Sequence, residues 1–382
     1  MSELNIPSLD IEEYDPELVD DSDEVSDESG GAITYGVIGS GQGGGRIAKA
    51  FFDLGYKKTA VFNTAQSDLA LLELPDNHKF LVESEGSQGA GKNQEKARVA
   101  FENKSQEVFN KLREIFGNNV DRILVCVGVA GGTGGGSTNT LIAIAKKYFS
   151  YIGHDNADDR VGVVASLPTT GEVASPRVAE NAYTRICDLW ERAARGEFAP
   201  LIIVDNDKIK KLYPQLTVKQ FWPTINNTVA GLFHVFNLLA TKNSNYTSFD
   251  PTDYDSIMKT KGCMIMGVTT VKNVDSETAL ANALKNNLEK TLLADGFDLT
   301  TATAAASIVV GGTNLYEEVQ GLMDSIEYAF DTLATLTGGS IIHRGIYEDS
   351  SKTNLVAYTI VGGLDAPRKR IKELKKFLRT KQ

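Results

Sequence analysis

The sequence predicts an α/β protein with a doubly wound, mostly parallel sheet, a long central helix and a smaller α+β domain with a mainly four-stranded sheet. Three observations predict this class. Short apolar runs alternate with helical patterns in the first half of the chain, one long helical pattern follows, and four more strand-like runs come after it. Alternating strands and helices are typical of parallel sheets, which bind ligands at the carboxyl ends of their strands.

The first half contains six predicted strands, each apolar enough to be buried. They cover residues 33–39, 58–64, 79–84, 122–128, 160–168 and 200–206. Helical patterns lie between them, at residues 43–55, 94–116, 137–149 and 175–194. We expect Gly117 to end the second of these helices and Ser137 or Thr138 to cap the third.

The second half begins with the long helical pattern at residues 222–241, which has Pro223 in its first turn, where proline is tolerated. Further strands are predicted at 261–271, 303–313, 338–347 and 354–363, with helices at 276–293 and 316–334. These patterns divide the chain into an acidic tail (1–31), a first domain (32–218), a connecting helix (219–243), a second domain (244–364) and a basic tail (365–382).

Composition limits the class of protein. Hydrophobic residues make up 42% of the 382, and no apolar stretch approaches the roughly 20 residues of a membrane span. The N-terminus shows no secretory signal pattern. Three widely separated cysteines indicate reduced thiols and a cytoplasmic protein, and the four histidines lack metal-ligand spacing, so no side chain is assigned as a metal ligand.

The net charge of −11 is concentrated at the N-terminus. Residues 1–30 hold twelve of the 50 acidic residues and none of the 39 basic ones, which predicts a disordered acidic tail. The segment from Arg368 onward is basic and places Ile371, Leu374 and Phe377 on one helical face, with Leu378 beside them. It is either a solvated tail or a helix that docks on an acidic partner, such as a second copy. We expect no nucleic-acid binding.

Three glycine-rich loops each follow a predicted strand and precede a predicted helix. They lie at residues 39–46, 86–93 and 128–137. Any one of them is explained by a tight turn, but three at one edge of a parallel sheet predict a phosphate pocket made from backbone N–H groups and helix N-termini.

Two of these loops also match other nucleotide sites. The first contains G-x-G-x-x-G, but the next strand ends in Asn63 instead of the acid of dinucleotide sites. The second is one residue from a P-loop, with Asn93 in place of the metal-binding hydroxyl. A P-loop-like or dinucleotide-binding enzyme that does not polymerise therefore stays open as an alternative.

The order of the motifs resembles the tubulin/FtsZ family. The run Gly131–Ser137 is similar to the family's glycine signature loop, and six other segments match in the same order. These segments are GSGQGGGR, FNTAQSDL, GAGKNQE, LPTTGEVASPR, VDNDKI and VVGGTNLYEEVQ. The resemblance covers about residues 32–364 and implies a GTP-binding domain at 32–218 and a GTPase-activating domain at 244–364.

The resemblance implies that GTP or GDP binds with Mg²⁺, and that the Thr133 hydroxyl contacts a phosphate. The implied nucleotide-binding residues are Gly41, Gln42, Gly43, Arg46, Asn63, Gly89, Ala90, Gly91, Asn93, Gly131, Gly132, Thr133, Gly134, Gly135, Glu172, Arg177, Asn206, Trp222 and Asn226. In this family the central helix reads the base. Trp222 and Asn226 have the i, i+4 spacing of one helix face, and Phe221 is an alternative for the stack.

The resemblance also implies that Asp250 and Asp253 are catalytic. In the family, the loop that carries them enters the nucleotide pocket of the neighbouring subunit and orients the attacking water. Four positions depart from the FtsZ pattern: Arg46, Ala65, Gln94 and Ser248.

The sequence therefore predicts a cytoplasmic GTPase that assembles head to tail with itself into a cytoskeletal filament, with hydrolysis stimulated by assembly. A filament protein that binds GTP without hydrolysing it is a further possibility, because Ser248 is altered. Other partners and the cellular process do not follow from the sequence.

Overall fold

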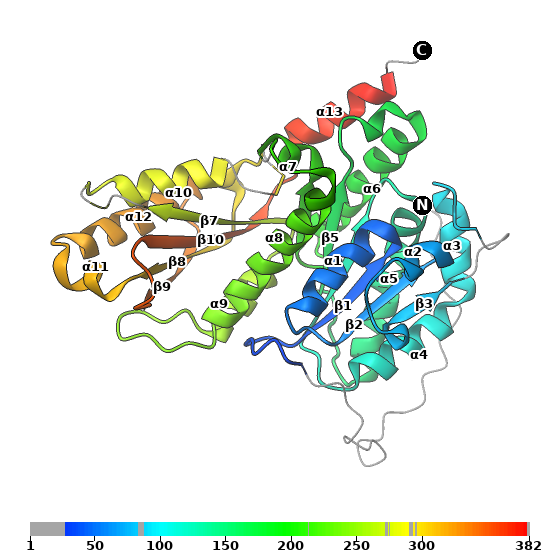
Figure 1. The fold of residues 1–382 in the computed structure, drawn as a ribbon, viewed down its shortest axis with the longest axis horizontal. Coiled ribbons are helices and arrows are strands. Elements are labelled where there is room, and N and C mark those ends of the chain that lie inside the picture. Colours follow the sequence, from blue (N-terminus) through cyan, green and yellow to red (C-terminus); the bar gives the residue numbers. More distant parts are fainter. Residues whose placement is uncertain are drawn as a thin grey trace.

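One ten-stranded sheet runs through the molecule, with strand order β3-β2-β1-β4-β5-β6-β7-β10-β8-β9 (Figure 1). The computed structural model describes residues 27–82, 88–212, 214–271, 274, 276–289, 293–294 and 296–379. Most of the predicted acidic tail, the end of the strand predicted at 79–84, and Gly86 and Ser87 of the second glycine loop lie outside these residues.

Six parallel strands form the N-terminal half of the sheet, as their apolar runs predict. They are β1 (Tyr35–Ser40), β2 (Thr59–Asn63), β3 (Lys79–Leu81), β4 (Arg122–Gly128), β5 (Val161–Leu167) and β6 (Leu201–Asp205). The helices of this half are α1 (Gly41–Asp53), α2 (Gln66–Ala70), α3 (Gln94–Asn103), α4 (Ser105–Phe116), α5 (Gly132–Tyr151), α6 (Pro176–Arg195) and α7 (Asn206–Leu212).

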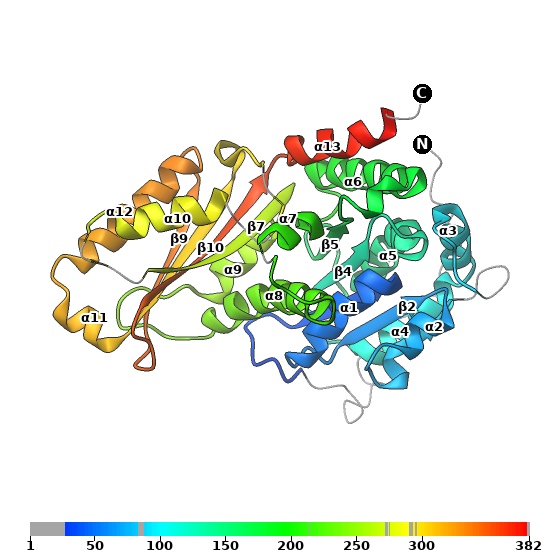
Figure 2. The same ribbon diagram turned by 45° about the horizontal axis from the view of Figure 1, so that its top comes forward.

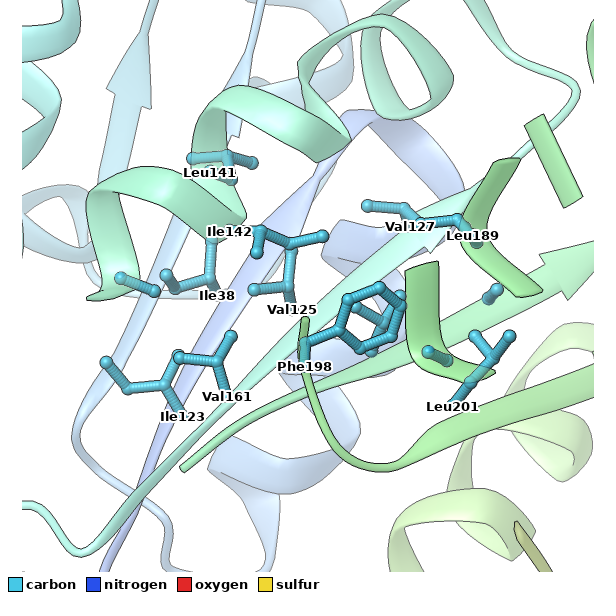
Figure 3. Packing of buried hydrophobic residues seen from close by; sticks show 14 of the residues in the cluster. Ile38, Ile123, Val125, Val127, Leu141, Ile142, Val161, Leu189, Phe198 and Leu201 are labelled. Carbon is cyan, nitrogen blue, oxygen red and sulfur yellow. The ribbon is translucent and has the colours of Figure 1, made fainter. Parts of the chain in front are cut away.

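Helices cover both faces of this half, and each face has its own core. In one core, Leu141 and Ile142 of α5 and Leu189 of α6 pack over the strands, where they meet side chains such as Val125 and Val127 (Figure 3). The other core places α1 and the central helix against the opposite face. Side chains buried on both sides explain why these strands are continuously apolar instead of alternating.

The central helix α8 (Val218–Leu239) begins four residues before the predicted start. Thr217 caps it through a capping box with Gln220, which sets the start and places Pro223 in the second turn. The predicted first-turn position of Pro223 is therefore wrong. The capping box was visible in the sequence as T-x-x-Q.

The C-terminal half contains the four predicted strands, β7 (Cys263–Val271), β8 (Ala304–Gly311), β9 (Ile341–Glu348) and β10 (Leu355–Leu364). β10 pairs antiparallel with β7 and β8, whereas β8 and β9 are parallel. This half continues the first sheet, because Cys263 and Met264 of β7 pair with Leu201 and Ile202 of β6.

Helices α9 (Pro251–Met258), α10 (Ala279–Glu289), α11 (Thr313–Glu318) and α12 (Leu322–Leu336) belong to this C-terminal half. Two predicted continuous helices are each split in two. The pattern at 316–334 breaks before α12, where Gly321 has a left-handed φ of 75°. The pattern at 94–116 breaks at Lys104, between α3 and α4.

The basic C-terminal segment forms helix α13 (Arg368–Arg379), which lies along α6 (Figure 2). Leu374 is fully buried, and Phe377 and Leu378 pack against the same core. The Arg370 side chain pairs with Asp205 at the end of β6, and its Nη2 also donates to the Pro168 carbonyl at 3.1 Å. The interpretation as a solvated tail is therefore wrong for residues 368–379, which dock on their own chain.

No helix among the described residues is long and apolar enough to cross a membrane.

Candidate functional site

A cavity of about 460 Å³ lies at the carboxyl ends of β1, β4 and β5. All three predicted glycine loops contribute to it, together with the loop after β5 and the start of α8. The predicted residues that line it are Gly41, Gln42, Gly43, Arg46, Gly89, Ala90, Gly91, Gly131, Gly132, Thr133, Gly134, Glu172, Asn206 and Trp222. The structure thus brings together residues as far apart in the sequence as Gly41 and Trp222.

Two helix N-termini open into this cavity. α1 begins at Gly41 and α5 begins at Gly132, and both residues line the cavity. Neither helix has a side-chain cap, and neither has an acidic residue in its first turn. The first N–H groups of a helix lack internal partners and carry partial positive charge, so this arrangement fits a polyanion.

Packing of α3 on α5 requires two glycines of the third loop, Gly135 and Gly136. A Cβ on Gly135 would lie 2.1 Å from Nε2 of Gln94, and one on Gly136 would lie 2.2 Å from the Gln94 carbonyl oxygen. α5 starts at Gly132, inside the glycine run, so the predicted cap at Ser137 or Thr138 is wrong. Thr138 is an interior residue whose hydroxyl donates to the Gly134 carbonyl at 2.7 Å.

Side chains that the motifs did not reveal hold the loops together. The Thr64 and Thr133 hydroxyl oxygens are 2.6 Å apart, and Thr64 Oγ1 also accepts from the Ala90 N–H at 3.1 Å. Gln94 Nε2 donates to the Val129 carbonyl at 2.8 Å. Thr64 lies in the matched segment FNTAQSDL, but that motif assigned it no role. Gln94 was visible only as a departure from the family pattern.

A second cavity of about 470 Å³ adjoins the first and shares Gly41, Gln42, Arg46, Asp68 and Trp222 with it. Asn63 and Asn226, which do not line the first cavity, line this one. The Arg46 guanidinium lies over the Trp222 ring, 5.6 Å from its centroid. Phe221 packs edge-on against Trp222 and lines neither cavity. Trp222 therefore offers its ring at the junction of the two cavities.

Three predicted nucleotide-binding residues line neither cavity. The Asn93 side chain caps α3 by accepting from the N–H groups of Glu95 and Lys96. Gly135 packs against Gln94. Arg177 is exposed on the first turn of α6.

Local hydrogen bonds fix the loop after β5. Glu172 accepts from the Thr169 N–H at 2.7 Å, and Asp207 accepts from the Thr170 N–H at 2.9 Å. Burial raises the pKa of Asp207, but Lys211 and the donors of Thr170 outweigh it and lower that pKa to about 2. Asp207 is therefore ionised at neutral pH and ties this loop to the start of α7, beside Asn206.

The two predicted catalytic aspartates lie outside both cavities. Asp250 caps α9, and the two residues bond reciprocally: Asp253 N–H donates to Asp250 Oδ1 at 2.8 Å, and Asp250 N–H donates to Asp253 Oδ2 at 3.2 Å. Trp222 is near the start of α8, whereas α9 follows its end (Figure 1). A helix of 22 residues is about 33 Å long, so the aspartates and the cavity are at opposite ends of α8.

The described residues contain no group of three or more His, Cys, Asp or Glu side chains that could hold a metal ion. Individual side chains with an oxygen atom that could bind a metal ion do line the cavity, and they include Gln42 and Asp68. Mg²⁺ at nucleotide sites keeps several waters and binds substrate phosphates, so these donors fit a metal that arrives with a nucleotide.

Known proteins similar to this chain share its architecture. The family model described as "Tubulin-like protein TubZ, C-terminal domain" matches residues 247–368. A tubulin-like protein CetZ from Pyrococcus abyssi is 24% identical over 333 residues, which is 86% of this chain and 85% of the relative. The cell division protein FtsZ of Haloferax mediterranei is 22% identical over 334 residues, 87% of this chain and 80% of the relative.

Among solved structures, the GTPγS-form protofilament of TubZ from Bacillus thuringiensis serovar israelensis superimposes with a TM-score of 0.76. The two chains are 19% identical, and the match covers 91% of this chain and 90% of that one. The ten-stranded sheet and its helices therefore have the fold of this group, and the predicted fold class is confirmed.

Proposed function

Because this chain is a divergent member of the tubulin/FtsZ superfamily, we propose that it is a cytoplasmic GTPase that assembles head to tail into filaments. One observation supports the proposal most directly. The cavity formed by the glycine loops and the aspartates Asp250 and Asp253 lie at opposite ends of α8. One chain cannot bring them together, but a second copy stacked in the same orientation can. Such a heterologous contact generates an open filament.

The nucleotide's phosphates bind at the N-termini of α1 and α5. Backbone N–H groups of the glycine loops donate to phosphate oxygens, and the Thr133 hydroxyl adds a side-chain contact. Thr64 supports this contact because its hydroxyl fixes both Thr133 and the Ala90 N–H. Mg²⁺ bound with the nucleotide supplies charge neutralisation to the phosphates.

The base binds where the two cavities meet. The Trp222 ring stacks on the purine, and the amides of Asn206 and Asn226 read the edge of guanine. Arg46 already lies over the Trp222 ring, so a purine that stacks on this face displaces the guanidinium or is covered by it. Glu172, which lines the first cavity, lies near the ribose.

Hydrolysis occurs when the next subunit closes the cavity. Its Asp250 and Asp253 carboxylates accept hydrogen bonds from a water and hold it in line with the γ-phosphate. Both carboxylates are already oriented by the reciprocal bonds at the start of α9, so assembly brings in a preformed group.

The test is to measure phosphate release and GTP-dependent pelleting in the same samples over a range of protein concentrations, with electron microscopy of the pellets. We expect the rate per subunit to rise steeply above the concentration at which filaments appear. A rate per subunit that stays constant through this threshold contradicts hydrolysis at the interface.

Removing the Trp222 ring is expected to weaken GTP binding. Stacking of a base on an aromatic ring contributes about 1–3 kcal/mol, so Trp222→Ala is expected to raise the GTP dissociation constant about 5- to 150-fold. Phe221→Ala is the matched control, because Phe221 is adjacent and lines neither cavity. Titration of monomers with labelled GTP measures both. If the two variants lose GTP affinity equally, this placement of the base is contradicted.

Lys92 separates the proposal from the P-loop alternative. It lies in the second glycine loop, lines the cavity, and has a left-handed φ of 62°. A P-loop lysine binds the β- and γ-phosphates directly, so its loss there is severe. Here we expect Lys92→Ala to change GTP binding by no more than about 1 kcal/mol, the value of an exposed ion contact. A loss of binding larger than that of Trp222→Ala favours the P-loop enzyme.

A further inference from the structure

His343 lies against one of the two aspartates and comes from a different part of the fold. Its Nδ1 is 2.7 Å from Oδ1 of Asp253, and its Nε2 is 3.1 Å from the Ser256 hydroxyl. Asp253 and Ser256 are on α9, whereas His343 is on β9, 90 residues later in the chain than Asp253. Both members of the Asp253–His343 pair are partly buried, with 28% and 19% of their side-chain surfaces exposed.

The hydrogen bonds define the orientation of the Asp253 carboxylate. An ionised carboxylate only accepts hydrogen bonds, so Nδ1 of His343 must donate to Oδ1. The Asp250 N–H donates to Oδ2 at 3.2 Å. Each oxygen therefore has one fixed donor within the chain, and its remaining lone pair is available to a water from outside.

Ser256 allows this arrangement in both charge states of the imidazole. Its hydroxyl is also 2.8 Å from the Asp253 carbonyl oxygen, so it can donate either there or to Nε2. When it donates to Nε2, His343 is neutral. When it donates to the carbonyl, Nε2 carries a proton and donates to Ser256 Oγ, and His343 is cationic.

We propose that His343 is a positioning residue that holds the Asp253 carboxylate in the orientation needed for hydrolysis on the neighbouring subunit. This inference rests on the proposed function, because it requires Asp253 to act on the attacking water. His343 itself does not touch the nucleotide of its own chain, since it lines neither cavity.

The test compares His343→Ala, His343→Asn and His343→Gln by phosphate release per polymerised subunit. Asparagine places an N–H donor near the position of Nδ1, whereas glutamine places it near Nε2. We expect His343→Ala and His343→Gln to lower this rate about 10- to 100-fold, with unchanged GTP affinity. His343→Asn is expected to recover most of the rate. His154→Ala, on the loop after α5, is the control.

The outcomes separate this inference from the proposed function. If Asp253→Ala stops hydrolysis but His343→Ala leaves the rate per polymerised subunit unchanged, the positioning role is wrong and the proposed function stands. The positioning role is also wrong if His343→Ala only lowers the amount of filament, because that indicates a structural role. If Asp253→Ala filaments hydrolyse GTP at the wild-type rate, the proposed function itself is wrong.

Discussion

Asp253→Ala is expected to slow phosphate release from filaments by at least about 100-fold and to leave GTP binding to the monomer unchanged. Asp253 lies at the far end of α8 from the cavity, so its loss cannot alter the nucleotide contacts of its own chain. Loss of a group that orients and activates a water removes a factor of about 10²–10⁴. Filaments of this variant are expected to persist longer, because GTP remains at their interfaces.

A matched control separates catalysis from helix capping. Asp253→Ala also removes half of the capping box of α9, which costs about 1 kcal/mol of stability. Asp298 is an exposed aspartate that caps the short 3₁₀ turn Leu299–Thr301, where it accepts from the Thr300 N–H at 3.1 Å. Asp298→Ala removes a similar cap away from α9 and is expected to keep the wild-type rate. If the Asp253→Ala monomer fails to bind GTP, the placement of this loop at the opposite end of α8 from the cavity is wrong.

Arg122→Ala is expected to destabilise the protein by about 3–5 kcal/mol. Arg122 begins β4 and is 1% exposed. Its Nη1 donates to Asp255 of α9 at 2.8 Å, and its Nη2 donates to the carbonyls of Asp159, Ala199 and Met258. Truncation leaves these oxygens without their charged donor and frees α9 from the first half of the sheet. Urea unfolding of the nucleotide-free monomer measures the change.

Arg344→Ala is the control for this prediction. Arg344 also pairs with carboxylates, Glu327 and Asp331, but its side chain is 37% exposed, and exposed pairs contribute about 0–1 kcal/mol. If the two arginine variants lose the same amount of unfolding free energy, the proposed role of burial is contradicted.

The stabilisation by Arg122 is also expected to depend on pH. Burial raises the pKa of Asp255, but Lys259 and Arg122 outweigh it and hold that pKa below its usual value. The stabilisation is therefore complete above the unfolded pKa of about 3.9 and is lost as the pH falls through the lower folded value. The stability difference between wild type and Arg122→Ala should narrow in this acid range.

Much of the fold could be predicted because local pattern and tertiary structure agree. The apolar runs of β1, β2 and β4–β6 are buried on both faces, and the four C-terminal runs all form strands. Element ends were less predictable. The helix predicted at 94–116 is split at Lys104, and a run with helical periodicity does not reveal such a break.

The candidate site could also be predicted from the sequence only in part. Loop residues such as Gly41 and Gly132 follow from motifs, because the carboxyl ends of parallel strands meet at one edge. The Thr64–Thr133 bond and the Asp253–His343 pair did not follow, since each joins segments that are 69 or 90 residues apart. Sequence alone also attributed the glycines of the third loop to the ligand, whereas Gly135 and Gly136 are required by α3.

The most direct test of a shared site mixes two defective variants. One carries Asp253→Ala and keeps its cavity. The other carries Trp222→Ala with Asn226→Ala and keeps its aspartates. If each active site is built from two subunits, the Asp253→Ala cavity receives working aspartates from the second variant, and phosphate release by the mixture exceeds the sum of the two variants alone. If both variants pellet in the same filaments and the mixture releases only that sum, hydrolysis at the subunit interface is contradicted.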